Sequence, residues 1–497
     1  MKINTLYLNG FTSRLCGRSG EAEARALRAK ARRLDGLAGL VSRFIPADLF
    51  AAKPSTRQRI YTPWVTFCAF LGQVLQRGAS CQTAVRQVQA MYLAQGDEIT
   101  VDDRTGGFCQ ARKRLCKDTL YTAFTRVGQW CANRPRKEDL WQGRVVKVMD
   151  GCGLSMPDTE ANRKIYPYAG GQKPGCGFPT GQLLGLFNLC TGHLVKFVTT
   201  SWKLHEAPLA RQLLGWVNKG EVILADRAFS SWGLIALFQQ KGVDLVMRLH
   251  QARKSATGQV IWRKPKRQKK MDLTDWEAMP ESLTLRIVRF HIDEPGFRTK
   301  NISLVTTLLD EVAYPDAVLA DLFRRRWQVE ICFRDIKNTL GLDVLRTLSP
   351  EMIEKEILLQ AIAYNLVRAL MLEAARQHDV RPDRLSFKGT VGVLHAFVPL
   401  LSGGGKSAAA HYENLLLALA AAPVPLRPNR SEPRAVKRRP KSYQSMTKPR
   451  HEMIVSKSRR QKLPTNPLTK RHSSQTLMSV ISGRPPELHA LTADIRV

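Results

Sequence analysis

The feature that most constrains the fold is a change of period near Arg144, where helical sequence gives way to short apolar strands. Strand-like segments cover residues 144–151, 182–192, 193–202, 221–229 and 243–250. The second and third of these form a predicted hairpin with Thr191-Gly192 at its turn. Amphipathic helical segments at 205–220 and 232–242 separate the later strands. Three strands, a helix, a strand, a helix and a strand in this order predict an α/β fold built on a mixed sheet.

The sequence on either side of this core has helical character. Before it, the apolar periodicity predicts helices at 22–44, 63–75, 80–95 and 107–131. After it, a long amphipathic helix is expected at 352–378, and helical sequence continues to about residue 421. The predicted organisation is a helical N-terminal region at 1–138, a core at 139–345, a helical C-terminal region at 346–425 and a tail at 426–497.

Between residues 251 and 300 the order of strands and helices is interrupted. A basic loop, WRKPKRQKK, precedes LTLRIVRFHI, which alternates like a strand, and a buried strand follows in NISLVTTLLD. We interpret 251–300 as a β-rich insertion inside the α/β core. Trp262 and Trp276 lie in this insertion. Packing within the protein is the favoured interpretation for both.

The charge balance indicates the partner. The 497 residues include 77 Lys and Arg against 42 Asp and Glu, a formal net charge of +35. Such a field attracts a polyanion and supports affinity for nucleic acid that does not depend on base sequence. Residues 427–471 alone hold fifteen Lys and Arg against two acids. We therefore predict that residues 426–497 are a basic, disordered tail that contacts DNA phosphates, with a solvated tail of no function as the alternative.

A second group of bases lies in the N-terminal region. The two helices around the connection at 97–104 could form a helix-turn-helix-like unit, with Arg112, Lys113 and Arg114 facing DNA. A plain helical bundle with solvated Arg and Lys side chains is an equally good interpretation.

The cysteines and the apolar segments exclude several classes of protein. The ten cysteines form no CxxC pair and no Cys/His ligand spacing, so reduced thiols without a structural zinc site are expected. The N-terminal segment lacks the apolar stretch of a signal peptide. We expect no membrane span, because no run of about 20 apolar residues occurs.

Two acids follow apolar strands, Asp150 in VVKVMDG and Asp226 in VILADRAF. In an open α/β sheet, ligands bind at the carboxyl ends of strands. A turn former or a helix cap is the alternative for either residue taken alone. Asp158 and Asp244 suit a ligand site less well, because the first follows a proline in a loop and the second opens a strand.

A third acid, Glu330, lies in the helical segment FRRRWQVEICFRDIKNTLG, which runs from Phe323 to Gly341. At about 100° per residue, Phe323, Arg326, Glu330 and Lys337 fall within an arc of roughly 60° on one helix face. A single carboxylate between a guanidinium and an ammonium group suits a site that holds a divalent metal ion and a phosphodiester. A solvated ion pair between Arg326 and Glu330 is the alternative.

Together the three acids predict a metal site. Three carboxylates without a thiolate or imidazole are the hard oxygen ligands that Mg²⁺ or Mn²⁺ prefers. Asp150, Asp226 and Glu330 are therefore the predicted metal ligands and catalytic residues. Two ions held about 4 Å apart could activate an attacking oxygen and stabilise the leaving oxygen of an in-line phosphoryl transfer.

The helix motif resembles that of the DDE transposases of the insertion-sequence-four family, Tyr-(2)-Arg-(3)-Glu-(6)-Lys. Phe323, Arg326, Glu330 and Lys337 match its spacing, with Phe in place of Tyr. The segments MDGCGLSMPDT and LADRAF resemble the first and second Asp motifs of the family. The resemblance covers roughly residues 55–420 and includes three motifs in the family's order.

The resemblance implies an RNase H-like core with a β-rich insertion, flanked by helical regions, in which Asp150, Asp226 and Glu330 form the acidic triad. It implies Mg²⁺ or Mn²⁺ as cofactor, as two ions. Phe323, Arg326 and Lys337 are the expected DNA-binding residues, although Phe323 lacks the hydroxyl that a tyrosine would present to a phosphate.

The implied activity is cut-and-paste transposition, in which the enzyme binds terminal inverted repeats in double-stranded DNA, cleaves at the transposon ends and joins them to target DNA. A homodimer pairing two ends is expected, in the bacterial cytoplasm and associated with the nucleoid. The alternatives are an RNase H-like nuclease that does not join strands and an inactive DNA-binding relic or repressor.

Overall fold

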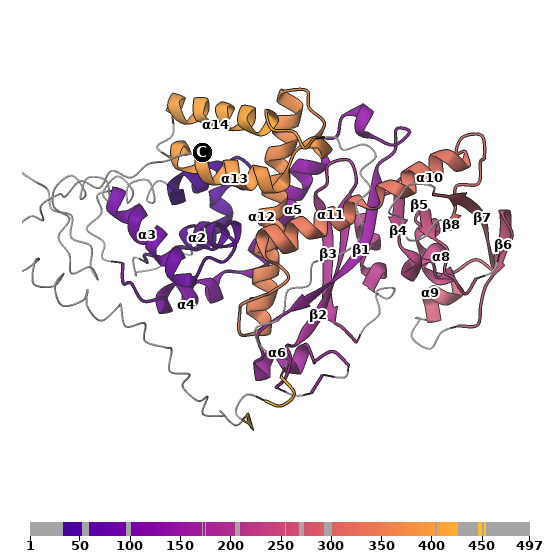
Figure 1. Ribbon diagram of the computed structural model, residues 1–497, viewed down its shortest axis with the longest axis horizontal. Coiled ribbons are helices and arrows are strands. Elements are labelled where there is room, and N and C mark those ends of the chain that lie inside the picture. Colours follow the sequence, from indigo (N-terminus) through magenta and orange to yellow (C-terminus); the bar gives the residue numbers. More distant parts are fainter. Residues whose placement is uncertain are drawn as a thin grey trace, which may run out of the picture. The chain divides into compact units, whose positions relative to one another are not determined.

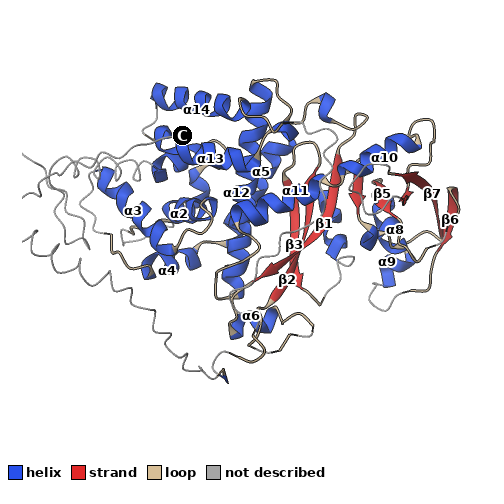
Figure 2. Ribbon diagram, viewed as in Figure 1, coloured by secondary structure: helices blue, strands red, loops and turns tan. Residues whose placement is uncertain are grey.

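The computed structural model contains one eight-stranded mixed sheet in its described residues (Figures 1 and 2). The structure describes residues 33–51, 59–95, 101–170, 172–173, 175–203, 209–253, 255–267, 273–292, 301–402, 405–425, 446–449 and 452–453. The strands are β1 Val146–Ser155, β2 Thr180–Asn188, β3 Leu194–Ser201, β4 Val222–Ala225, β5 Asp244–Arg248, β6 Gly258–Arg263, β7 Ser282–His291 and β8 Asn301–Thr306. They lie in the order β3-β2-β1-β4-β5-β8-β7-β6.

The first five strands have the arrangement of an RNase H-like core. Strands β1, β2 and β3 form an antiparallel meander, and β4 and β5 run parallel to β1. The crossover into β5 passes through α8 (Trp232–Gln240), which begins where the Ser231 side chain accepts a hydrogen bond from the Leu234 N–H. All four residues of β4 are buried, as expected for a central parallel strand covered on both faces. The predicted α/β fold class is confirmed.

The connection between β3 and β4 differs from the prediction. An amphipathic α-helix was expected at 205–220, of which 204–208 lie outside the described residues. The described part contains the 3-10 helix η3 (Arg211–Trp216). The Lys147 ammonium donates to the Trp216 carbonyl at 2.8 Å, so a buried side chain from β1 takes the place of the next helical hydrogen bond.

The predicted hairpin between β2 and β3 is present. Its connection spans residues 189–193, and Asn188 organises it because its Oδ1 accepts from the N–H groups of Cys190 and Thr191 at 2.9 and 3.2 Å. Gly192 adopts a φ of 70°, a conformation that glycine tolerates at little cost.

Strands β6 and β7 lie within the predicted insertion and extend the core sheet. β8 pairs antiparallel with β5 on one side and with β7 on the other. Trp276 packs at 5.7 Å from the Trp232 ring, and the Trp262 carbonyl accepts a hydrogen bond from the Trp232 indole at 3.1 Å. Both insertion tryptophans therefore contribute to the packing around α8, as the favoured interpretation predicted.

Helices from both ends of the chain share one core. The N-terminal helices are a helix at 33–42, then η1 Ala47–Phe50, α2 Pro63–Leu75, α3 Cys81–Gln95, α4 Gly106–Arg114 and α5 Lys117–Ala132. The single helix predicted at 107–131 is two helices, because Leu115 adopts an extended ψ of 127° that buries its side chain. The helix predicted at 22–44 is described only from residue 33.

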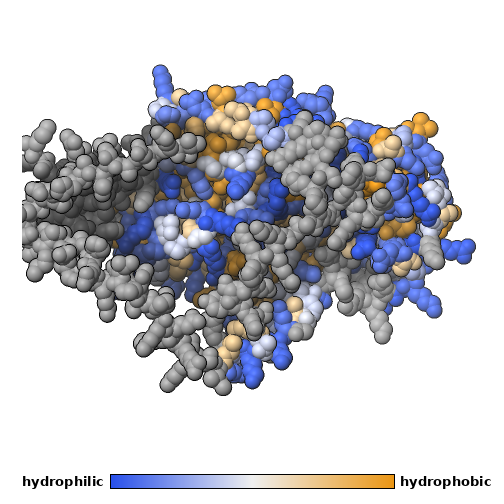
Figure 3. All heavy atoms as spheres, viewed as in Figure 1, coloured by the Kyte–Doolittle hydropathy of each residue, from blue (hydrophilic) through white to orange (hydrophobic). Residues whose placement is uncertain are grey.

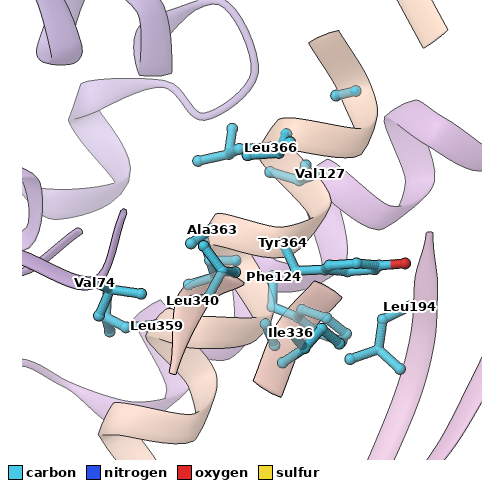
Figure 4. Close-up of a cluster of buried hydrophobic side chains, with 14 of the residues drawn as sticks. Val74, Phe124, Val127, Leu194, Ile336, Leu340, Leu359, Ala363, Tyr364 and Leu366 are labelled. Atoms are coloured by element: carbon cyan, nitrogen blue, oxygen red, sulfur yellow. The ribbon is translucent and has the colours of Figure 1, made fainter. Parts of the chain in front are cut away.

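The long helix α12 (Pro350–Gln377) runs beside α5 and α2. Figure 4 shows how its residues Leu359, Ala363 and Tyr364 meet side chains from α2, α5, β3 and residues 336–340. The helix is long and apolar enough to cross a membrane, but its apolar window is 94% buried within the fold. It therefore forms the centre of a protein core.

Four further elements follow α12: η6 Pro382–Arg384, α13 Phe387–Phe397, η7 Val398–Leu401 and α14 Gly405–Ala420. These elements belong to a compact unit that ends at Gln444, and Ser445–Val497 form a second unit. Where the surface of described residues is visible in Figure 3, much of it is hydrophilic. Most of the predicted tail lies outside the described residues.

Candidate active site

Asp150 and Asp226 lie at the same level on neighbouring strands. In the parallel pairing of β1 with β4, Met149 is opposite Ala225, and each aspartate is the next residue. Contrary to the prediction, Asp150 does not end its strand. β1 continues to Ser155 because its later residues still pair with β2, while β4 ends at Ala225. Asp150 therefore marks the point where the parallel pairing stops.

Glu330 reaches this point from α11 (Gln328–Arg334), which packs against β1. Phe333, nearly one turn after Glu330, contacts the edge of the Phe187 ring of β2 at 5.0 Å. Gly185, opposite Asp150 in the sheet, allows this approach: a Cβ there would lie 2.7 Å from the Phe187 ring and 3.3 Å from the Phe333 ring. The absence of a side chain at Gly185 thus brings α11 close to the sheet.

The three predicted acids act on one another electrostatically. Burial raises the pKa of the Asp150 carboxyl, and the charges of Asp226 and Glu330 raise it further. The Gly151 N–H, which donates to Asp150 at 2.9 Å, and the Arg326 guanidinium act in the opposite direction. A cluster of like charges in a partly buried position is typical of functional sites.

Arg326 lies between two of these acids. Its Nη1 is 3.6 Å from Asp150 Oδ2 and its Nη2 is 3.4 Å from Glu330 Oε1, and its side chain is 14% exposed. The solvated ion pair considered from the sequence accounts for only one of these two contacts. Arg326 holds a strand carboxylate and a helix carboxylate together.

The segment predicted as one helix from Phe323 to Gly341 has three parts. α10 (Asp316–Arg325) ends just before Arg326, α11 follows, and Asp335–Leu340 form a π-helical turn that Gly341 closes at a φ of 94°. Because a π turn is wider than an α turn, the constant rotation of about 100° per residue does not extend to Lys337. Lys337 is partly exposed on this turn.

Phe323 differs from the prediction of a DNA-binding residue. It is 6% exposed within the hydrophobic core, and the Arg326 guanidinium lies 5.7 Å from its ring. An apolar ring in this position gains free energy from burial. Phe323 therefore packs in the core beside Arg326, and little of its ring is accessible to a phosphate.

The three basic residues Arg112, Lys113 and Arg114 of the N-terminal region differ in burial. Arg112 is 9% exposed, and its guanidinium donates to the sulfur atoms of Cys81 and Cys109 at 3.3 and 3.5 Å. It does not face DNA as the helix-turn-helix interpretation requires, whereas Lys113 and Arg114 are exposed. Arg112 is a core residue of the helical bundle.

Sequence reasoning passed over two residues beside the acids. Trp327, in the short break before α11, is 51% exposed next to Arg326. Gly185 interrupts the apolar run Leu183–Phe187 of β2, and a glycine inside such a run is a signal of close approach by another element.

The donors available to a metal ion are all oxygens. Among the residues that the structure describes, no three His, Cys, Asp or Glu side chains are drawn together into a group that could hold a metal ion. The positive charge between Asp150 and Glu330 comes from Arg326. The donor set nevertheless fits Mg²⁺ or Mn²⁺, because carboxylate oxygens are the ligands these ions prefer and a cation would favour the charged form of Asp150, which burial and the neighbouring acids disfavour.

Comparison with known proteins agrees with this geometry. A family model described as "Transposase DDE domain" matches residues 141–366. The transposase InsG for insertion sequence element IS4 of Escherichia coli (strain K12) is 26% identical over 355 residues, which are 68% of this chain and 78% of that protein. The probable transposase for insertion sequence element IS5377 of Geobacillus stearothermophilus is 25% identical over 202 residues, 38% of this chain and 49% of that protein.

Among solved structures, a piggyBac transposase synaptic complex with hairpin DNA matches with a TM-score of 0.39 and 11% identity, over 79% of this chain and 85% of that one. This likeness is too distant to add to the assignment. The family match spans the sheet and all three acids, and it agrees with the order of the motifs. Residues 141–366 therefore form a transposase DDE domain, and the chain is a DNA transposase similar to that of insertion sequence element IS4.

Proposed function

We propose that Asp150, Asp226 and Glu330 are the catalytic acids of this transposase and hold two divalent ions, Mg²⁺ or Mn²⁺. The observation that supports the proposal is that Arg326 contacts both the Asp150 and the Glu330 carboxylates, while the charge of Asp226 acts on Asp150 from the neighbouring strand. Such ions, when bound, would polarise the scissile phosphate and lower the pKa of an attacking water.

Asp150 serves as the fixed point of the site. Its carboxylate is partly buried and accepts a hydrogen bond from the Gly151 N–H, so its orientation is restricted. Asp226 is held in a similar way, because its side chain accepts a hydrogen bond from the Arg227 N–H at 2.7 Å. Two strand carboxylates with restricted orientations are a suitable base for ligands that must hold their geometry through a reaction.

In this proposal, Arg326 releases the two carboxylates and binds a DNA phosphate instead. Without DNA, its guanidinium neutralises Asp150 and Glu330. A phosphate of the bound strand offers a stronger, bidentate partner, and its arrival frees the two carboxylates to act as metal ligands. Lys337 supplies a second cation from the π turn to a phosphate that flanks the scissile bond.

The proposed DNA substrates follow from the assignment of the chain as a transposase. We infer that the enzyme recognises terminal inverted repeats in double-stranded DNA, cuts at the element's ends and joins the freed 3′ ends to target DNA in a cut-and-paste movement. Two copies pair the two ends in a synaptic complex, on the DNA of the bacterial nucleoid. The net charge of +35 supports the non-specific part of this affinity.

The test is to incubate the purified full chain with Mg²⁺ and a DNA fragment that carries the ends of its own element. We expect cleavage at the ends and products joined to a second DNA, both abolished by a chelator. Cleavage without joined products would support the nuclease interpretation. Binding with neither product would support the relic interpretation, and both results would contradict the proposal.

A further inference from the structure

A buried ion pair lies just beyond Glu330 on the same helix. Asp335, the first residue of the π turn, is 5% exposed, and its Oδ2 is 3.3 Å from Nη2 of Arg368 in α12. Burial is the main cause that raises the pKa of the Asp335 carboxyl, with Arg368 and then Arg334 opposing it. Neither Asp335 nor Arg368 belongs to the acidic triad.

The same guanidinium also reaches the turn between β2 and β3. Arg368 Nε donates to the Tyr364 hydroxyl oxygen at 3.0 Å, and the Tyr364 O–H donates to the Gly192 carbonyl at 2.6 Å. A Cβ at Gly192 would lie 3.1 Å from the central guanidinium carbon of Arg368, so the turn packs directly on this group. Three elements thus meet at one arginine: the Glu330 helix, α12 and the turn of the sheet.

Arg368 and the Gly192 turn contact the face of α11 that lies opposite Glu330. Cys332 Sγ lies 3.8 Å from Arg368 Nη2 and 3.9 Å from the Gly192 carbonyl. At about 100° per residue, Cys332 and Asp335 both fall on the side of α11 away from Glu330. Rotation of α11 about its axis would break these contacts and move Glu330 relative to Asp150.

Net stability does not explain such a pair well. Removing two charges from water costs about as much free energy as their attraction returns, and apolar residues often serve equally well. Aromatic rings also pack on Arg368, with those of Tyr364 and Phe387 at 5.3 and 5.4 Å from its guanidinium. An ion pair supplies a directional contact at the π turn, where the helical register is unusual, and apolar residues would not.

We propose that Asp335 and Arg368 are positioning residues for Glu330. The ion pair sets the rotation of α11 about its axis and the residue at which the π turn begins. It thereby sets the direction in which the Glu330 side chain points relative to Asp150 and Asp226. This inference rests on the proposed catalytic role of Glu330, through which the pair acts without touching DNA or a metal ion itself.

The experiment uses the full chain with Asp335→Asn, which keeps the shape and removes the charge, and Arg368→Lys, which keeps the charge and removes the fork. Three quantities are measured: the dissociation constant for an end fragment, the single-turnover cleavage rate of bound DNA with Mg²⁺, and amide hydrogen exchange of residues 328–340 without metal. We expect cleavage to fall about tenfold or more, DNA binding to change by less than about threefold, and exchange to become faster.

Asp244→Asn is the matched control. It breaks the ion pair of Arg144 with Asp244, 2.5 Å apart at the other end of β5, far from the acids along the strands. This variant should lose thermal stability while its folded molecules cleave at the wild-type rate and its residues 328–340 exchange as before. Wild-type cleavage by a folded Asp335→Asn protein would overturn the inference.

If Asp335→Asn does not fold, the double variant Asp335→Leu/Arg368→Met decides the question, because it leaves no unpaired buried charge. A stable double variant that cleaves slowly supports a positioning role. One that cleaves normally, or that does not fold although Arg368→Lys folds and is fully active, shows that the pair serves packing alone. An inactive wild-type protein would instead count against the proposed function.

Discussion

Asp150 is the residue where the competing electrostatic effects of the site are strongest. Burial and two neighbouring acids raise the pKa of its carboxyl, whereas Arg326 and a backbone N–H favour its charged form. Such a residue is poorly placed for stability and well placed for binding a cation, which is the usual conflict at catalytic positions. Its substitutions should separate activity from stability.

The acids should be indispensable for cleavage. Asp150→Asn, Asp226→Asn and Glu330→Gln each remove a ligand charge and preserve shape, so each should lower the cleavage rate by on the order of a hundredfold or more, with end binding retained. Asp158→Asn is the matched control, because Asp158 pairs with Arg163 at 2.8 Å outside the acidic triad. Gel assays of cleavage and binding measure both properties, and near wild-type cleavage by any triad variant would remove that residue from the site.

The raised pKa of Asp150 also predicts that the variant Asp150→Asn is more stable than the wild type at neutral pH. A carboxyl whose pKa is higher in the folded than in the unfolded protein favours folding below the unfolded value, about 3.9, and loses that contribution as the pH rises through the folded value. At neutral pH without metal, Asp150→Asn should therefore raise the melting temperature. The difference should disappear near pH 4 and shrink when Mg²⁺ is added. A lower melting temperature at pH 7 would contradict this account.

Arg326 and Lys337 should act on bound DNA more than on folding. Arg326→Ala and Lys337→Ala are expected to slow cleavage of a pre-bound end by about tenfold or more, a larger effect than their loss of stability accounts for. Arg324→Ala is the control, since Arg324 is exposed and pairs with Asp321 at 3.1 Å, only two residues from Arg326. If both variants cleave normally, Arg326 and Lys337 do not bind phosphates during cleavage, and the basic residues of this segment are only a solvent-exposed face.

The elements around the site are held at separations that small residues permit. α11 approaches β1 and β2 because Gly185 leaves room for the rings of Phe187 and Phe333. The arrangement makes the position of Glu330 depend on one missing side chain in a strand that carries no catalytic group.

Gly185→Ala tests this dependence. The new Cβ would lie 2.7 Å from the Phe187 ring, so the helix or the ring must shift, at a cost of about 1–3 kcal/mol in the free energy of unfolding. Cleavage per folded molecule should fall as well. Gly153→Ala in β1 has nothing within 4 Å of its Cβ and should leave both quantities unchanged. Denaturant titration and cleavage rates provide the comparison, and equal behaviour of the two variants would rule out the proposed spacing role.

Local sequence predicted the elements whose signals are local. The bounds of α2 follow from Thr62, which caps Val65, and from Pro63 at the first helical position. The hairpin of β2 and β3 follows from the Thr191-Gly192 turn and the apolar runs beside it. The sequence motifs also pointed to Arg326, Glu330 and Asp150, and the structure places Arg326 in contact with both acids.

The differences from prediction arise from distant contacts. β1 continues past Asp150 because β2 supplies partners, which no pattern within β1 encodes. The π turn begins at Asp335, whose partner Arg368 lies in another helix. Arg112 is buried against residues of α2 and α3 that are about 30–40 positions earlier in the sequence, and Phe323 is buried in the core. Helical periodicity alone assigns such residues to an exposed face.

At the scale of the whole molecule, the charge is distributed unevenly along the chain. Deleting residues 427–497 removes the fifteen Lys and Arg of residues 427–471 and leaves every named helix and strand. Binding to unrelated DNA should weaken. The slope of log affinity against log salt should decrease in magnitude by about one or more, because fewer phosphate contacts form and fewer counterions are released. An unchanged slope in salt titrations would show that the tail does not contact DNA.

The buried position of α12 has a consequence for synthesis of the protein. The helices α2 and α5 leave the ribosome long before α12, yet they bury their apolar faces against it. A nascent chain must therefore keep these faces exposed until residue 377 has emerged, and a product that stops earlier has no partner for them. A prematurely terminated copy of this transposase should be a substrate for chaperones and proteases, and the helices before residue 138 should not persist as a free-standing competitor for DNA.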